Sequence, residues 1–253
     1  TLRAFLTPQT GIFDQKHRRC VDCRQTLGII GGMSPESTVI YYQEINRLVN
    51  QKAGGNHSAP MVMLSVDFEE IVRRQKSGAW QETGEILAEA AVKLESIGAQ
   101  GILLATNTMH KNAAEIQAAV QIPFLHILDA TVEVIKARGI KKIGVLGTLF
   151  TMQDAFYREG LKQRGIEMVV PDEQRQAEVH RIIFEELCLG KILPESHDFY
   201  LETVHDLAEQ GAEGIILGCT EIGLLIREGD HKLPFFDTAA LHAQAAAEFV
   251  LGK

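Results

Sequence analysis

Two residues that could transfer protons, Thr106 and Cys219, follow apolar segments that are almost alike. Gly98–His110 runs Gly-Ala-Gln-Gly-Ile-Leu-Leu-Ala before Thr106, and Gly211–Ile222 runs Gly-Ala-Glu-Gly-Ile-Ile-Leu-Gly before Cys219. Each apolar run is typical of a buried parallel strand, and ligands of open α/β sheets bind beyond the carboxyl ends of the strands. A hydroxyl and a thiol at two equivalent strand ends could address opposite faces of one carbon atom.

The similarity between the two halves extends beyond these segments. Leu27–Gly32, Leu-Gly-Ile-Ile-Gly-Gly, resembles Ile143–Thr148, Ile-Gly-Val-Leu-Gly-Thr. The tetrapeptide Ile-Pro-Phe-Leu at Ile122 resembles Leu-Pro-Phe-Phe at Leu233. Three matches at nearly constant offset indicate an internal duplication.

Strand-like and helix-like segments alternate along the chain, which predicts an α/β fold with parallel sheets. We expect two pseudosymmetric, Rossmann-like, three-layer lobes with the active site in the cleft between them. Residues 1–25 are expected to be an N-terminal extension outside the fold. Residues 26–122 and 233–253 are assigned to the first lobe and residues 123–232 to the second, since the last strand and helix match those that end the first half.

Composition excludes two classes of partner. The 253 residues are 45% hydrophobic and 23% charged, with a formal net charge of −8. Nucleic-acid binding needs a basic face, and a membrane span needs about 18 consecutive apolar residues. The sequence offers neither, so we expect no nucleic-acid partner, no membrane association and a cytoplasmic location.

The other cysteines point to no metal site. Cys20 and Cys23 form a C-x-x-C motif, but no second pair completes a zinc ligand set. Cys188 lies in a segment with helical periodicity and is expected to be a small buried apolar residue.

The strand ends favour a small carboxylate as ligand, because backbone N–H groups and helix N-termini bind anions. The turn Gly28–Gly32 reads G-x-x-G-G and lacks the dinucleotide-binding spacing. Its glycines also fit a structural role in close strand–helix packing.

Three motifs then resemble one known family. Gly31–Thr38, Asn107–His110 and Gly218–Glu221 are similar to segments of the aspartate/glutamate racemase family. The resemblance is closest to bacterial members with threonine in place of the first catalytic cysteine. It implies an amino-acid racemase without a cofactor or metal, acting on aspartate, glutamate or other amino acids. Family members are often dimers, so a homodimer is expected.

The resemblance also implies roles for individual residues. Thr106 and Cys219 stand at the positions of the two catalytic cysteines. Substrate-binding positions would stabilise the carboxylate as it becomes an enediolate or line the pocket; they are Met33, Gln75, Asn107, Thr108, Thr148 and Thr220. Thr148 and Thr220 fit helix caps equally well, and His110 fits a structural role better than that of a third acid.

The threonine matters because an aliphatic hydroxyl is a far weaker acid than a thiol, whose ordinary pKa is near 8.5. Thr106 can donate a proton to a carbanion more readily than it can remove one. Cys219 is therefore expected to be the base, and the resemblance assigns it to the L-enantiomer.

Substrate preference is less closely defined. Acidic-substrate members carry a lysine where this chain has Ala177, which leaves room for neutral polar amino acids. The remaining basic candidates for a distal carboxylate are Arg73, Arg74, Lys76, Arg175 and Arg181. Two other functions fit the residues: a single-cysteine decarboxylase or cis-trans isomerase of the same superfamily, and a non-catalytic amino-acid-binding protein.

Overall fold

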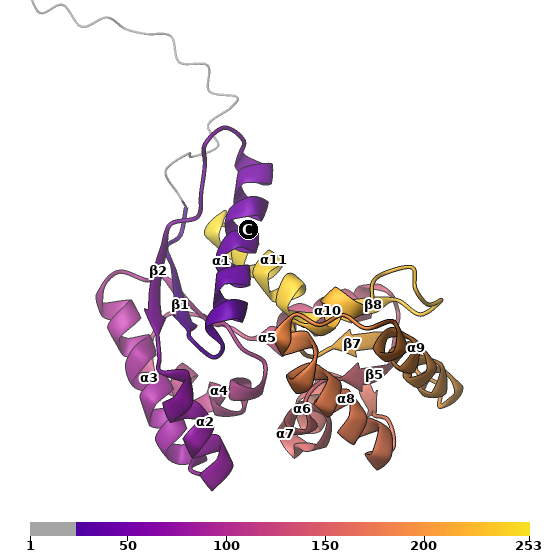
Figure 1. The fold of residues 1–253 in the computed structure, drawn as a ribbon. Helices are drawn as coiled ribbons and strands as arrows, with labels where there is room; N and C mark the ends of the chain where they lie inside the picture. Colours follow the sequence, from indigo (N-terminus) through magenta and orange to yellow (C-terminus); the bar gives the residue numbers. More distant parts are fainter. Residues whose placement is uncertain (1–23) are drawn as a thin grey trace, which may run out of the picture.

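A computed structural model describes residues 24–253 as two α/β lobes, each built on a four-stranded parallel sheet (Figure 1). The strand orders, β2-β1-β3-β4 and β6-β5-β7-β8, are the same, as the duplication predicts. The first sheet contains β1 (Leu27–Gly31), β2 (Met61–Ser65), β3 (Gly101–Leu104) and β4 (Phe124–Leu125). The second contains β5 (Lys142–Leu146), β6 (Glu167–Val169), β7 (Ile215–Leu217) and β8 (Phe235–Asp237).

Helices cover both faces of each sheet, which confirms the three-layer prediction. Successive strand residues point to opposite faces: Ile29 lies in one apolar cluster of the first lobe and Ile30 in the other. The first half of the chain contains α1 (Pro35–Ala53), α2 (Phe68–Ser77), α3 (Trp80–Ser96), a 3₁₀ segment (Thr108–Asn112), α4 (Ala113–Ala119) and α5 (Ile127–Ala137). The second half contains α6 (Leu149–Gln153), α7 (Ala155–Gln163), α8 (Glu173–Glu185), a 3₁₀ segment (Leu187–Leu189), α9 (Pro194–Glu209), α10 (Ile222–Leu225) and α11 (Thr238–Val250).

The two lobes exchange one helix each. Strand β4 pairs with β3 in the first sheet, and the following α5 then packs in a core of the second lobe. Strand β8 pairs with β7 in the second sheet, and α11 returns to pack on α1 and the first-lobe core. Figure 1 shows α11 running back beside α1.

This exchange corrects the expected lobe boundaries. Residues 123–125 were assigned to the second lobe and residues 233–237 to the first, yet β4 and β8 each extend the sheet of their own half. The chain crosses only after each strand, where His126 caps α5 and Asp237 caps α11. Backbone pairing holds each short strand in the sheet of its own half: Ile102 pairs with Phe124 in the first sheet, and Ile215 pairs with Phe235 in the second.

The glycines at the ends of β1 and β5 serve close packing. A Cβ on Gly31 would lie 2.4 Å from the Thr38 side chain, and one on the equivalent Gly147 would lie 3.0 Å from Thr151. The strand and the next helix can approach this closely only without a side chain there. The structural interpretation of the first glycine turn is therefore supported.

The polar stretch 67–80 contains α2, capped at its start by the Asp67 side chain and ended by Gly78 in the left-handed conformation. Residues 1–23, which include Cys20 and Cys23, lie outside the described residues. Residues 24–253 form no helix that could span a lipid bilayer.

Candidate active site

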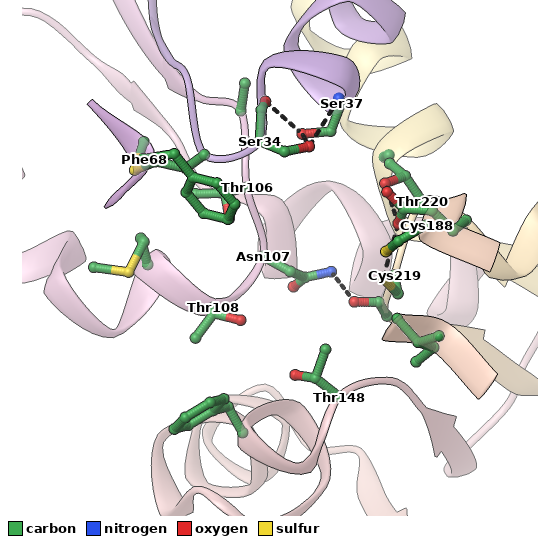
Figure 2. Close-up of a pocket in the computed structure, with 18 of the residues that line it drawn as sticks. Ser34, Ser37, Phe68, Thr106, Asn107, Thr108, Thr148, Cys188, Cys219 and Thr220 are labelled. Carbon is green, nitrogen blue, oxygen red and sulfur yellow. Dashed lines mark hydrogen bonds between the residues drawn. The ribbon is translucent and has the colours of Figure 1, made fainter. Parts of the chain in front are cut away.

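A cavity of about 500 Å³ lies between the lobes, at the carboxyl ends of strands from both sheets. Its walls come from α1, α2 and the segment after β3 on one side and from α6, α8 and the segment after β7 on the other. Figure 2 shows Thr106 and Cys219 on opposite sides of this space. All eight residues predicted from the sequence line it: Met33, Gln75, Thr106, Asn107, Thr108, Thr148, Cys219 and Thr220.

Thr106 follows β3, and its backbone is held by a buried histidine. The Ile127 N–H donates to Nε2 of His110 at 3.1 Å, so Nδ1 carries the proton and donates to the Thr106 carbonyl at 2.8 Å. Burial, with smaller contributions from His126 and His242, lowers the pKa of His110 well below its ordinary value. His110 is therefore a neutral structural residue, as predicted, and it fixes the strand end that presents Thr106.

Asn107 connects the two lobes. Its Nδ2 donates to the Gly218 carbonyl at 3.2 Å and to the Thr238 hydroxyl at 2.8 Å (Figure 2). Its Oδ1 is buried and has no hydrogen-bond partner within residues 24–253. Both amide hydrogens are used, so the one free hydrogen-bonding group of Asn107 is a buried acceptor and not the donor to the carboxylate that the sequence predicts.

Cys219 follows β7 and is hydrogen-bonded to a carboxylate. Its thiol donates to Oε2 of Glu221 at 2.9 Å, and the Thr220 hydroxyl donates to the same oxygen at 2.8 Å. Burial and then the Glu221 charge raise the pKa of the Cys219 thiol well above its ordinary value. The thiol is thus protonated at neutral pH and has a proton acceptor in contact with it.

Comparisons with known proteins agree with this geometry. The model of the Asp/Glu/Hydantoin racemase family matches residues 30–246. The chain belongs to this family. It is 50% identical to a Yersinia pestis protein whose description assigns it to the Asp/Glu racemases, with a TM-score of 0.87 over 90% of this chain and 99% of that one.

Two further relatives match this chain over nearly their full length. An aspartate racemase homologue from Pyrococcus horikoshii is 36% identical, with a TM-score of 0.82 over 89% of this chain and 99% of that one. The broad specificity amino-acid racemase RacX of Bacillus subtilis is 28% identical over 89% of this chain and 98% of its own. The family relationship supports racemase activity at the level of amino acids as a class.

The two threonines that also fitted helix caps have different surroundings. Thr148 occupies the N-cap position of α6, but its side chain makes no capping hydrogen bond within the described residues. Thr220 precedes the N-cap residue of α10, and its hydroxyl is bonded to Glu221. Neither side chain caps a helix, so the Thr148 hydroxyl can serve a ligand and Thr220 supports the carboxylate.

The two pocket residues Met33 and Gln75, from the first half of the chain, differ in role. Met33 is buried at the start of α1 and contributes to the apolar wall. Gln75 lies on α2, and its Nε2 lies 2.8 Å from the sulfur of Met109. A thioether is a weak acceptor, so a ligand oxygen can replace it as the partner of this amide.

Several site residues were not predicted. Glu221 was visible as part of the motif Gly218–Glu221, but only its contact with the thiol reveals its role. Cys188 was expected to be buried, and this was wrong: it lies in the 3₁₀ turn after α8, is exposed and lines the cavity. The thiol group is nevertheless partly shielded from water, and this shielding, followed by the charges of Glu221 and Glu36, raises the pKa of Cys188 to about 11.

The basic candidates for a distal carboxylate are nearly all engaged elsewhere. Arg73 and Arg74 pair with Glu70, Arg175 with Asp206 and Arg181 with Glu178, and none of these arginines lines the cavity. Lys76 does line it, and no ion pair of Lys76 is found among residues 24–253. No group of metal-ligating side chains occurs in the described part of the chain.

Proposed function

We propose that this protein is a cofactor-independent amino-acid racemase in which Cys219 and Thr106 transfer protons on opposite faces of the substrate α-carbon. The observation that carries the proposal is their position at equivalent strand ends, β3 and β7, facing one cavity. Family membership supports racemisation of an amino acid, and the cavity geometry supports these two residues as the proton donors and acceptors.

Glu221 is the acceptor for the Cys219 proton, although burial and the Glu221 charge keep the thiol protonated at rest. A proton passes from the thiol to the carboxylate across the 2.9 Å hydrogen bond, leaving a thiolate and a carboxylic acid. The thiolate then removes the α-proton of the L-enantiomer. In the reverse direction the neutral thiol donates its proton to the carbanion and takes one back from Glu221. General acid–base catalysis by a positioned side chain accelerates a reaction by about 10²- to 10⁴-fold.

The remaining groups orient the amino acid. The Oδ1 of Asn107 has no hydrogen-bond partner among residues 24–253 and can accept a hydrogen bond from the substrate ammonium once the side chain turns toward the cavity that Asn107 lines. The Thr148 hydroxyl and the Gln75 amide are suited to donate to the carboxylate and to stabilise it as it becomes an enediolate. Thr106 then donates its hydroxyl proton to the opposite face of the carbanion. Water returns a proton to the Thr106 oxygen, and Glu221 releases its proton to water, which restores both groups for the next cycle.

Proton NMR in D₂O tests this function. The enzyme is incubated with a panel of L-amino acids, and loss of the α-proton signal and the ratio of enantiomers are followed together. A racemase exchanges the α-proton, forms the D-enantiomer and leaves the carbon skeleton intact. A decarboxylase releases CO₂, and a binding protein shows calorimetric binding without exchange; either result contradicts the proposal.

Three expectations accompany this function. Activity should survive dialysis against a chelator and should not require pyridoxal phosphate; restoration by a divalent metal or by pyridoxal phosphate would contradict a cofactor-independent mechanism. A homodimer should appear in light scattering after size-exclusion chromatography. A cytoplasmic location should appear on fractionation of the source cells.

A further inference from the structure

Three exposed phenylalanines, Phe68, Phe150 and Phe184, surround the cavity and are called here the aromatic rim. Their exposed fractions are 39%, 40% and 50%, and no other phenylalanine of residues 24–253 is exposed. All three line this one cavity. Exposed apolar side chains gathered at a cavity mark a binding surface, because each ring is in contact with water until a ligand covers it.

The aromatic rim is contributed by both lobes and is held in place. Phe150, on α6, meets the Trp80 ring of the first lobe edge-on at 6.4 Å. Phe184, on α8, lies 4.7 Å from the His180 ring. Phe68 begins α2, and Val72, one turn later, lines the same cavity. Figure 2 shows the Phe68 ring in the space that Thr106 faces.

The charges around the cavity do not match an acidic side chain. Its ionisable residues that are charged at neutral pH are Lys76 and Glu221, and Glu221 is committed to Cys219. Arginine, which binds carboxylates with two parallel hydrogen bonds, is absent from this lining. His180 also faces the cavity, but burial lowers its pKa, so it is neutral at pH 7. A distal carboxylate would thus lie against the apolar rim, with one exposed lysine as the only cation that residues 24–253 contribute to the lining.

We propose that the aromatic rim is the side-chain subsite and that the substrate is an amino acid with a bulky apolar side chain, aromatic or branched. This proposal rests on the racemase function proposed above. Cavities of ~300–1,000 Å³ hold drug-sized ligands, so the 500 Å³ here exceed what a four-carbon diacid fills. The rim covers the apolar side chain while the α-carbon lies between Thr106 and Cys219.

Exchange of the α-proton in D₂O tests the subsite directly. We expect kcat/KM for L-phenylalanine and L-leucine to exceed that for L-aspartate and L-glutamate by about tenfold or more. Phe68→Ala and Phe184→Ala should each lower kcat/KM for L-phenylalanine about tenfold, and that for L-alanine by less than about threefold. Ile97→Ala removes an exposed apolar side chain outside the cavity and is the matched control.

Three results would overturn the proposal. The first is faster exchange of L-aspartate or L-glutamate than of L-phenylalanine, removed by Lys76→Gln, which would keep the racemase but make Lys76 the specificity residue. The second is an equal loss for L-alanine and L-phenylalanine in the rim variants, which would assign the rings to lobe closure. If no amino acid exchanges its α-proton, the racemase function has failed, and calorimetry then tests the subsite separately. Tighter binding of L-phenylalanine than of L-aspartate supports the subsite. Tighter binding of L-aspartate is the third result that would overturn it.

Discussion

The strand ends after β3 and β7 share a backbone arrangement and differ in their proton chemistry. After β3, Thr106 is followed by Asn107 and Thr108, and its backbone is anchored by the neutral His110. After β7, Cys219 is followed two residues later by Glu221, which accepts the thiol hydrogen. When Thr106 is aligned with Cys219, Thr108 occupies the position that corresponds to Glu221, so the first half has a hydroxyl where the second half has a carboxylate.

The difference shows how a duplicated scaffold can give two unequal proton-transfer groups. The Cys219 thiol is protonated at rest but has a carboxylate in contact that can accept its proton, whereas no such acceptor contacts the Thr106 hydroxyl among residues 24–253. We therefore assign deprotonation and reprotonation to the second half and proton donation to the first. Each prediction below breaks or sharpens that assignment.

Removing the thiol should have the largest effect. We expect Cys219→Ala to lower α-proton exchange from the L-enantiomer by about 10⁴-fold, because the base of the second strand end is gone. Exchange is followed by proton NMR in D₂O, with circular dichroism as the control for folding. Exchange near the wild-type rate would show that the base lies elsewhere.

The histidines near the first strand end should affect the stability of the protein and not the rate of proton transfer. Burial lowers the pKa of His126 and of His242 to about 4, and that of His110 is also lowered. The unfolded chain binds protons with a histidine pKa near 6.5, so acid favours unfolding. The contribution of these histidines to the free energy of unfolding is fully present above about pH 6.5 and is lost as the pH falls toward 4. For His242 alone the loss is on the order of 3 kcal/mol.

Denaturant unfolding measured between pH 7.5 and 4 checks this dependence. Tyr41 donates to Nδ1 of His242, and Nε2 donates to the Leu125 carbonyl, so both nitrogens are used in the neutral form. His242→Gln should be less stable at pH 7.5 and should lose less stability on acidification than the wild type. An unchanged slope would mean that other groups set the acid limit.

Neutralising the carboxylate should have a smaller effect on the rate than removing the thiol. We expect Glu221→Gln to slow L-side exchange about 10²-fold at pH 7, because the thiol loses its proton acceptor. The same change removes a negative charge that raises the pKa of Cys219, so the pH midpoint of the remaining activity should move to lower pH. Glu185→Gln, on the exposed surface of α8, is the matched control.

A rate loss in Glu221→Gln without any shift of the pH profile would reduce Glu221 to a positioning residue. A loss of similar size in Glu185→Gln would show that the effect is not specific to the thiol contact.

Substitutions of Thr106, the weaker acid of the two proton-transfer residues, should have the smallest effect. We expect Thr106→Cys to raise net inversion about tenfold, because a thiol deprotonates this face more readily than a hydroxyl does, and L-side exchange should change less. Thr106→Ala should retain some L-side exchange and lose most inversion. Since the equilibrium constant of a racemisation is one, kcat/KM for the two enantiomers must change together. Equal inversion rates in wild type and both variants would remove Thr106 from the mechanism.

The sequence determined the architecture because local patterns repeat. Buried strands that run into a glycine and then a helix occur twice at nearly constant spacing, and both sheets form in the same strand order. The same repetition places Thr106 and Cys219 at equivalent strand ends, since parallel strands of one sheet all end on one side. Both residues line the cavity that the sequence predicted between the lobes.

Only the tertiary structure decided what surrounds these residues. The hydrogen bond from Cys219 to Glu221, the orphan oxygen of Asn107 and the cavity position of Cys188 depend on side-chain direction, which spacing does not specify. The exchange of α5 and α11 was missed in part, because a short strand can extend either sheet until its ladder partner is known. The aromatic rim is likewise invisible in the sequence: its rings come from α2, α6 and α8, and long-range packing alone brings them to one cavity.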